Sequence, residues 1–73
     1  MDSSIKHAAI LANLSALRMT LAGALERAMD AENAVKEGQI NQAIGAAHGI
    51  ETMLQDAAAL YTAALALHRS GRA

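Results

Sequence analysis

The stretch VKEGQIN, residues 35–41, separates two long runs of helix-forming residues and decides the fold. Lys36 suits the negative end of a helix dipole, and Gly38 readily adopts the left-handed conformation in which many helices end. The flanking runs contain no proline and are rich in residues that lose little side-chain freedom in a helix. We therefore predict helices over about residues 4–37 and 40–69, joined by a turn at about 38–39.

The predicted helices have similar lengths, so a tight turn lets them lie antiparallel along their whole length as a single all-α hairpin domain over residues 1–73. Ser3 or Ser4 can cap the first helix, and Gly71 is the expected stop of the second. The turn locally resembles that of a tetratricopeptide unit, but the chain holds only one hairpin. The turn chemistry therefore predicts the hairpin and no function.

The apolar residues are too numerous for two helices to cover. The first helix has one seam with the alternating three and four spacing of packed helices, formed by Ile10, Leu14, Leu17, Leu21, Ala24, Ala28, Ala31 and Val35. The second helix has two neighbouring sectors. The main sector comprises Ile40, Ile44, Ala47, Ile50, Leu54, Ala57, Tyr61, Ala64 and Leu65; the shoulder sector comprises Met53, Leu60 and Leu67 beside Gly45 and Gly49. One partner helix cannot cover both sectors.

Composition leads to the same expectation. The chain is 53% apolar but has one aromatic residue, Tyr61, and no cysteine, so its core must be thin and without disulfides. Self-association is then the leading source of stability. We predict a homo-oligomer, a dimeric four-helix bundle in the first instance and a trimer or hexamer of hairpins as the alternative.

The predicted oligomer interface draws on both helices. Gly45 and Gly49 are included because a glycine inside a helix costs about 1 kcal/mol relative to alanine, and close approach of another helix is its usual reason. A tolerated surface position is the alternative interpretation of both glycines. The predicted interface residues are Leu14, Leu21, Gly45, Gly49, Met53, Leu54, Leu60, Tyr61 and Leu67.

Arg18 is the anomaly of the sequence, since it falls inside the apolar stripe of the first helix. The structural interpretation is that its alkyl stem covers the seam and its guanidinium pairs with a carboxylate, such as Asp56 across an interface. The functional alternative is an anion site where copies of Arg18 converge. His48 and Glu51 lie one turn apart, but the other helix offers no second ligand pair, so we predict no metal site.

Several functional classes are disfavoured. No serine or threonine has a recognisable catalytic base and there is no glycine-rich loop after a strand, so we expect neither an enzyme nor a cofactor. The net charge is −1 and the basic residues do not gather on one face, which argues against nucleic acid. Residues 8–25 are mostly apolar but include Asn13 and Arg18. An arginine near the centre of a span costs roughly 2.5–3.5 kcal/mol, so we expect no membrane insertion.

The function that remains is that of a protein-interaction or assembly module. The N-terminal residues show no secretory signal pattern, so the expected location is the cytoplasm. An oligomer that binds a small anion or a nucleotide between protomers, using Arg18, His48 and Glu51, is the alternative. A third interpretation is an RNA-binding dimer that resembles plasmid copy-number regulators of this shape, although a shared shape does not carry a function.

Overall fold

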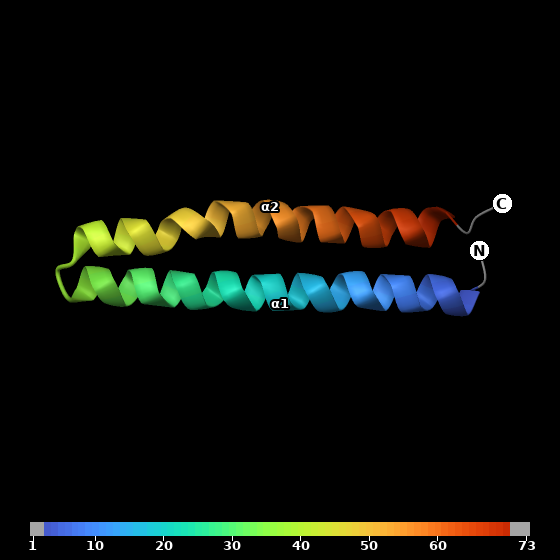
Figure 1. Ribbon diagram of the computed structural model, residues 1–73, viewed down its shortest axis with the longest axis horizontal. Helices are drawn as coiled ribbons and strands as arrows, with labels where there is room; N and C mark the ends of the chain where they lie inside the picture. Colours follow the sequence, from blue (N-terminus) through green and yellow to red (C-terminus); the bar gives the residue numbers. More distant parts are fainter. Residues whose placement is uncertain (1–2, 71–73) are drawn as a thin grey trace.

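The protein is a helical hairpin in which two long helices lie side by side (Figure 1). The computed structural model describes residues 3–70, which form α1 (Ser3–Lys36) and α2 (Ile40–Ser70). The Cα atoms span 56 × 15 × 11 Å. The predicted all-helical hairpin is confirmed, and both helices begin and end within one residue of the predicted bounds. Gly71, the predicted stop of the second helix, lies outside the described residues.

The turn is built on a left-handed glycine. Gly38 has a φ of 78°, a conformation that glycine adopts without steric cost. The backbone N–H of Gln39 donates to the carbonyl of Ala34 at 2.8 Å, and that of Gly38 donates to Val35 at 2.9 Å. This pair of hydrogen bonds is the Schellman motif, which satisfies carbonyls that the end of α1 would leave unpaired. Gln39 then accepts the first helical hydrogen bond of α2 from Ala43.

Replacement of Gly38 by alanine is expected to lower the free energy of unfolding by about 1–2 kcal/mol, because an L-residue is strained at this φ. Space is not the cause, since a Cβ atom at Gly38 would meet nothing within 4 Å. Chemical denaturation followed by circular dichroism measures the change.

Gly45→Ala is the matched control. A Cβ atom at Gly45 also meets nothing within 4 Å, but Gly45 is inside α2 and has no left-handed φ. Alanine there is expected to raise the free energy of unfolding by about 0.5–1 kcal/mol through its higher helix propensity. If both substitutions changed the free energy of unfolding in the same direction and by similar amounts, the left-handed φ of Gly38 would not be what stabilises the turn.

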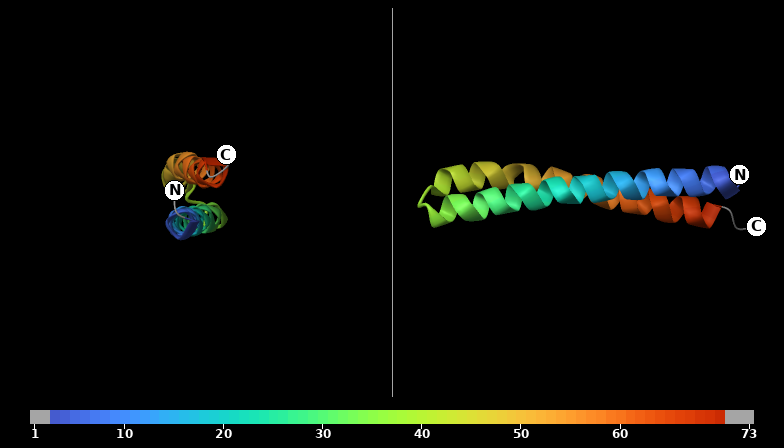
Figure 2. Two further views of the ribbon diagram at one scale, coloured as in Figure 1. Left: turned by 90° about the vertical axis from the view of Figure 1, so that its right-hand side faces the viewer. Right: turned by 90° about the horizontal axis from the view of Figure 1, so that it is seen from below.

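The two helices meet along an inner seam with alternating spacings of three and four residues, the pattern of a coiled coil. The two helices wind gently round each other (Figure 2). On α1 the half-buried or buried seam residues are Lys6, Ile10, Asn13, Leu17, Thr20, Ala24, Ala31 and Ala34. On α2 they are Ala43, Ala46, Ile50, Met53, Ala57, Leu60, Ala64 and Leu67.

Small side chains dominate this seam. Within residues 3–70 the buried hydrophobic residues are all alanines: Ala24, Ala34, Ala43, Ala57 and Ala64. The amide of Asn13, a polar member of the seam, donates to the carbonyl of Ala9 in its own helix at 3.1 Å. Alanine carries little apolar surface, so the fully buried residues contribute little hydrophobic stabilisation. The larger seam residues Ile10, Leu17, Ile50, Met53, Leu60 and Leu67 are only half-buried.

Candidate assembly interface

The most exposed large aliphatic side chains belong largely to a second row on each helix, one residue after the positions that follow the seam spacing. The α1 row is His7, Leu11, Leu14, Arg18, Leu21, Leu25, Ala28, Glu32 and Val35; the α2 row is Ile44, Ala47, Glu51, Leu54, Ala58, Tyr61, Leu65 and His68, with Ile40 before it. The large hydrophobic members other than Leu65 are exposed, from 43% for Leu14 to 66% for Leu11. Together these two rows form the leucine face.

Both rows lie on the same side of the hairpin. A step of one residue rotates the side chain by about 100° around the helix axis. Because α1 and α2 run in opposite directions, this rotation leads from the inner seam to the same side on both helices. The leucine face is therefore two helices wide and extends along most of the rod.

The seam predicted on the first helix divides between these two surfaces. Ala24 is buried and Ile10, Leu17 and Ala31 are half-buried against α2. Leu14, Leu21, Ala28 and Val35 are exposed on the leucine face instead. The apolar stripe of α1 thus points between its partner helix and the open face, which is the direction of the centre of a four-helix bundle.

The two sectors of the second helix are also separated. Met53, Leu60 and Leu67, predicted in the oligomer interface, are half-buried in the inner seam and serve the hairpin itself. Leu54 and Tyr61 are exposed on the leucine face. The apolar residues of the shoulder sector therefore face α1. The main sector divides between the inner seam, which contains Ile50, Ala57 and Ala64, and the leucine face.

The glycines of the predicted interface have a different environment from Leu21 and Leu54. A Cβ atom at Gly49 would lie 2.6 Å from Nη1 of Arg27, so the Arg27 guanidinium lies on the Gly49 backbone. Gly49 precedes Ile50 of the inner seam and Gly45 lies one turn before it, which puts both glycines on the side opposite the leucine face. Within the hairpin, Gly49 makes room for an arginine of α1 rather than for a close helix crossing.

A second glycine contact was missed from the sequence. A Cβ atom at Gly23 would lie 3.4 Å from Cε of Met53, so this methionine packs on the glycine of the facing helix. Arg27 was missed as well, although its position three residues after Ala24 and four before Ala31 follows the seam spacing. The Gly23–Met53 and Arg27–Gly49 contacts lie on adjacent turns and fix the register of α1 against α2.

The predicted ligand residues do not form one cluster in the hairpin. Arg18 and Glu51 are exposed on the leucine face, on α1 and α2 respectively. His48 is exposed and lies away from this face, two residues after Ala46 of the inner seam. Asp56, the suggested partner of Arg18, precedes Ala57 of the inner seam and lies on the opposite side. Within residues 3–70 no group of three or more His, Asp or Glu residues is placed to hold a metal ion.

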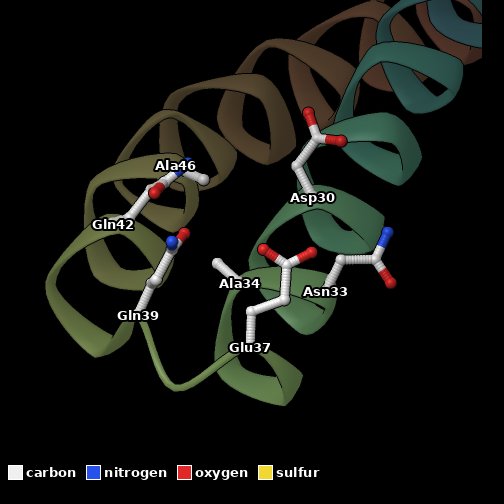
Figure 3. Close-up of a pocket in the computed structure, with 7 residues that line it drawn as sticks. All are labelled: Asp30, Asn33, Ala34, Glu37, Gln39, Gln42 and Ala46. Atoms are coloured by element: carbon white, nitrogen blue, oxygen red, sulfur yellow. The ribbon is translucent and has the colours of Figure 1, made fainter.

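A pocket of about 320 Å³ opens beside the turn (Figure 3). Its lining residues are Asp30, Asn33, Ala34, Glu37, Gln39, Gln42 and Ala46. The carboxylates of Asp30 and Glu37 disfavour an anion, since like charges repel at short range. The pocket contains none of the three predicted ligand residues and lies on the side opposite the leucine face.

Comparison with known proteins does not assign the chain. No family model, curated protein or solved structure matches it. The functional argument therefore depends on the surfaces of the hairpin.

α1 has the length and composition of a membrane-crossing helix. An 18-residue window of Ser3–Lys36 has a mean hydropathy of 1.5, and 6% of this window is buried in the hairpin. Signal sequences and the mostly buried core helices of soluble proteins can reach the same length and hydropathy. An apolar helix with so little burial needs a further covering surface, and both lipid and protein provide such surfaces.

Proposed function

We propose that this chain is an assembly module in which two copies pack leucine face against leucine face as a four-helix bundle. In most proteins leucine and isoleucine are among the most buried residues. The observation that supports the proposal is that the hairpin reverses this order. Here alanines fill the core of the hairpin, and Leu14, Leu21, Leu54 and Tyr61 remain exposed.

The leucine face is large enough for a specific interface. The rows of the leucine face extend over roughly 42 Å of helix on a hairpin 15 Å wide at the Cα atoms, so the face covers on the order of 600 Å² per copy. Two such faces bury about 1,200 Å², the lower end of the range for specific protein interfaces. The centre of the face is largely apolar, and monomeric proteins rarely expose contiguous apolar patches larger than a few hundred Å².

The charged members of the leucine face are compatible with burial of the rest. Arg18, Glu32 and Glu51 belong to the part of each row that lies farther from the inner seam. Long side chains at the edge of an interface keep their charged ends in water while their stems cover apolar surface. In the proposed dimer these residues border the interface, and Leu14, Leu21, Leu54 and Tyr61 occupy its centre.

A dimer is expected in solution at micromolar concentration, with a light-scattering mass of twice the chain mass of 7.6 kDa. Buffer without detergent is the main condition, and the same sample with lipid vesicles is the control for a lipid-covered face. A folded monomer in buffer, or transfer of the chain to vesicles, would overturn the proposal.

A further inference from the structure

The register of the hairpin makes the centre of the leucine face uneven along its length. Gly23 is level with Met53 and Arg27 with Gly49, and each step back along α1 is matched by a step forward along α2. Among the members of each row that lie nearer the inner seam, the level pairs are therefore His7–His68, Leu14–Tyr61, Leu21–Leu54, Ala28–Ala47 and Val35–Ile40.

Large and small side chains are segregated in these pairs. Leu14 and Tyr61 make the face high toward the open end, while Ala28 and Ala47 make it low toward the turn. Leu21 and Leu54 lie halfway along the rod. The leucine face thus has a ridge at the Leu14–Tyr61 level and a hollow at the Ala28–Ala47 level, and Val35 and Ile40 border the hollow beside the turn.

Two copies can pair face to face around a two-fold axis in two ways. With the axis along the rod, both turns lie at the same end and α1 faces α2 of the second copy. Leu14 then meets Tyr61 of the second copy and Ala28 meets its Ala47, so ridge meets ridge and hollow meets hollow. Such an interface is overpacked at the Leu14–Tyr61 level and leaves a void at the Ala28–Ala47 level, and both faults are destabilising.

With the axis across the rod, the turns lie at opposite ends and each helix faces its own copy. Leu14 then meets Ala28 of the second copy, and Tyr61 meets its Ala47. Leu21 and Leu54 meet their own copies at the axis. Large side chains fill the hollows left by small ones, which is the arrangement that gives dense packing.

The histidines favour the same arrangement. His7 and His68 share one level at the open end. If both turns lay at one end, two copies of each would converge at the other end, where four imidazole rings would meet without an apolar partner. With the turns at opposite ends, His7 faces Val35 of the second copy and His68 faces its Ile40.

We infer that the occupant of the leucine face is a second, antiparallel copy of this chain, with the two-fold axis crossing the rod through the Leu21 pair and the Leu54 pair. The inference rests on the proposed self-association and specifies its geometry. The turn of each copy then lies beside the open end of the other.

The chain has no cysteine, so single cysteines can report the geometry without background. Glu37 is exposed in the turn and suits a nitroxide label as Glu37→Cys. Antiparallel copies place the two labels roughly 50 Å apart, because about 32 residues of helix rise separate their levels. Copies with both turns at one end place them under about 30 Å apart, since only the bundle diameter and the label arms separate them. Pulsed electron paramagnetic resonance distinguishes these distances.

Oxidation of Leu21→Cys is the second measurement. In the antiparallel dimer two copies of residue 21 meet at the axis, so an intermolecular disulfide is expected to form within the dimer. Leu14→Cys is the matched control, because two copies of residue 14 then lie about 20 Å apart along the rod and cannot be joined. Rapid disulfide formation at residue 21 and its absence at residue 14 is the expected result.

The outcomes separate the inference from the proposed function. A dimeric mass with a short label distance overturns the antiparallel geometry and leaves self-association standing. A monomeric mass of the labelled protein and of the unmodified chain overturns both. A dimer with a long label distance but no disulfide at residue 21 overturns the position of the axis.

Discussion

Replacing Leu21 with glutamate is expected to convert the dimer to monomers. In the proposed bundle this residue meets its own copy at the centre of the interface, so the substitution removes two leucines from the contact and puts two carboxylates there. Each leucine contributes about 2 kcal/mol of burial or more, so the dimer dissociation constant should rise at least about a thousandfold. Sedimentation equilibrium or light scattering across a dilution series measures the shift.

Met19→Glu is the matched control for this substitution. Met19 is 65% exposed and lies two residues before Leu21, but outside the leucine face. The control should keep the dimeric mass. Retention of the dimer by Leu21→Glu, or its loss in Met19→Glu, would show that the interface lies on another side of the hairpin.

Leu54→Ala is expected to lower the free energy of unfolding by about 2–5 kcal/mol, the range for a leucine removed from a core. The hairpin alone predicts a much smaller loss, below about 0.5 kcal/mol, because Leu54 is 52% exposed there. The size of the loss therefore distinguishes a face covered by a second copy from one open to water. Chemical denaturation at two protein concentrations makes the measurement, since the stability of a dimer depends on concentration.

Met29 provides a control with the same exposure. It is also 52% exposed in the hairpin, but it lies on the outer side of α1, away from the leucine face. Met29→Ala should change the free energy of unfolding by less than about 0.5 kcal/mol. Equal losses at Leu54 and Met29 would contradict a leucine face that is specifically covered.

The hairpin could be predicted because its signals are local. Gly38 marks the turn by its own backbone freedom, and the absence of proline leaves both helices uninterrupted. These signals depend on neighbouring residues alone. They therefore indicated the helix bounds without knowledge of what each helix contacts.

The assignment of apolar residues to surfaces could not be predicted in the same way. The stripe through Leu14, Leu17 and Leu21 is wide enough to serve two neighbouring surfaces, and spacing alone does not divide it. The division depends on the rotation of α1 against α2, which the contacts of Gly23 and Gly49 fix across the seam. Such contacts join residues far apart in the chain and leave no local pattern.

The glycines illustrate the same limit. A helical glycine indicates close approach of some group, and the sequence suggested a neighbouring helix at Gly49. The structure puts the Arg27 guanidinium there. Nothing in the sequence indicated this contact, because Arg27 and Gly49 lie in different helices and no local pattern relates them.

The turn leaves the beginning of α1 and the end of α2 at the same end of the rod (Figure 1). When two antiparallel copies pair as proposed, groups joined to these helix ends on one copy are held roughly 50 Å from those on the other, because about 32–36 residues of helix rise separate them. The assembly would then act as a spacer of fixed length, whose reach is set by the number of residues in each helix.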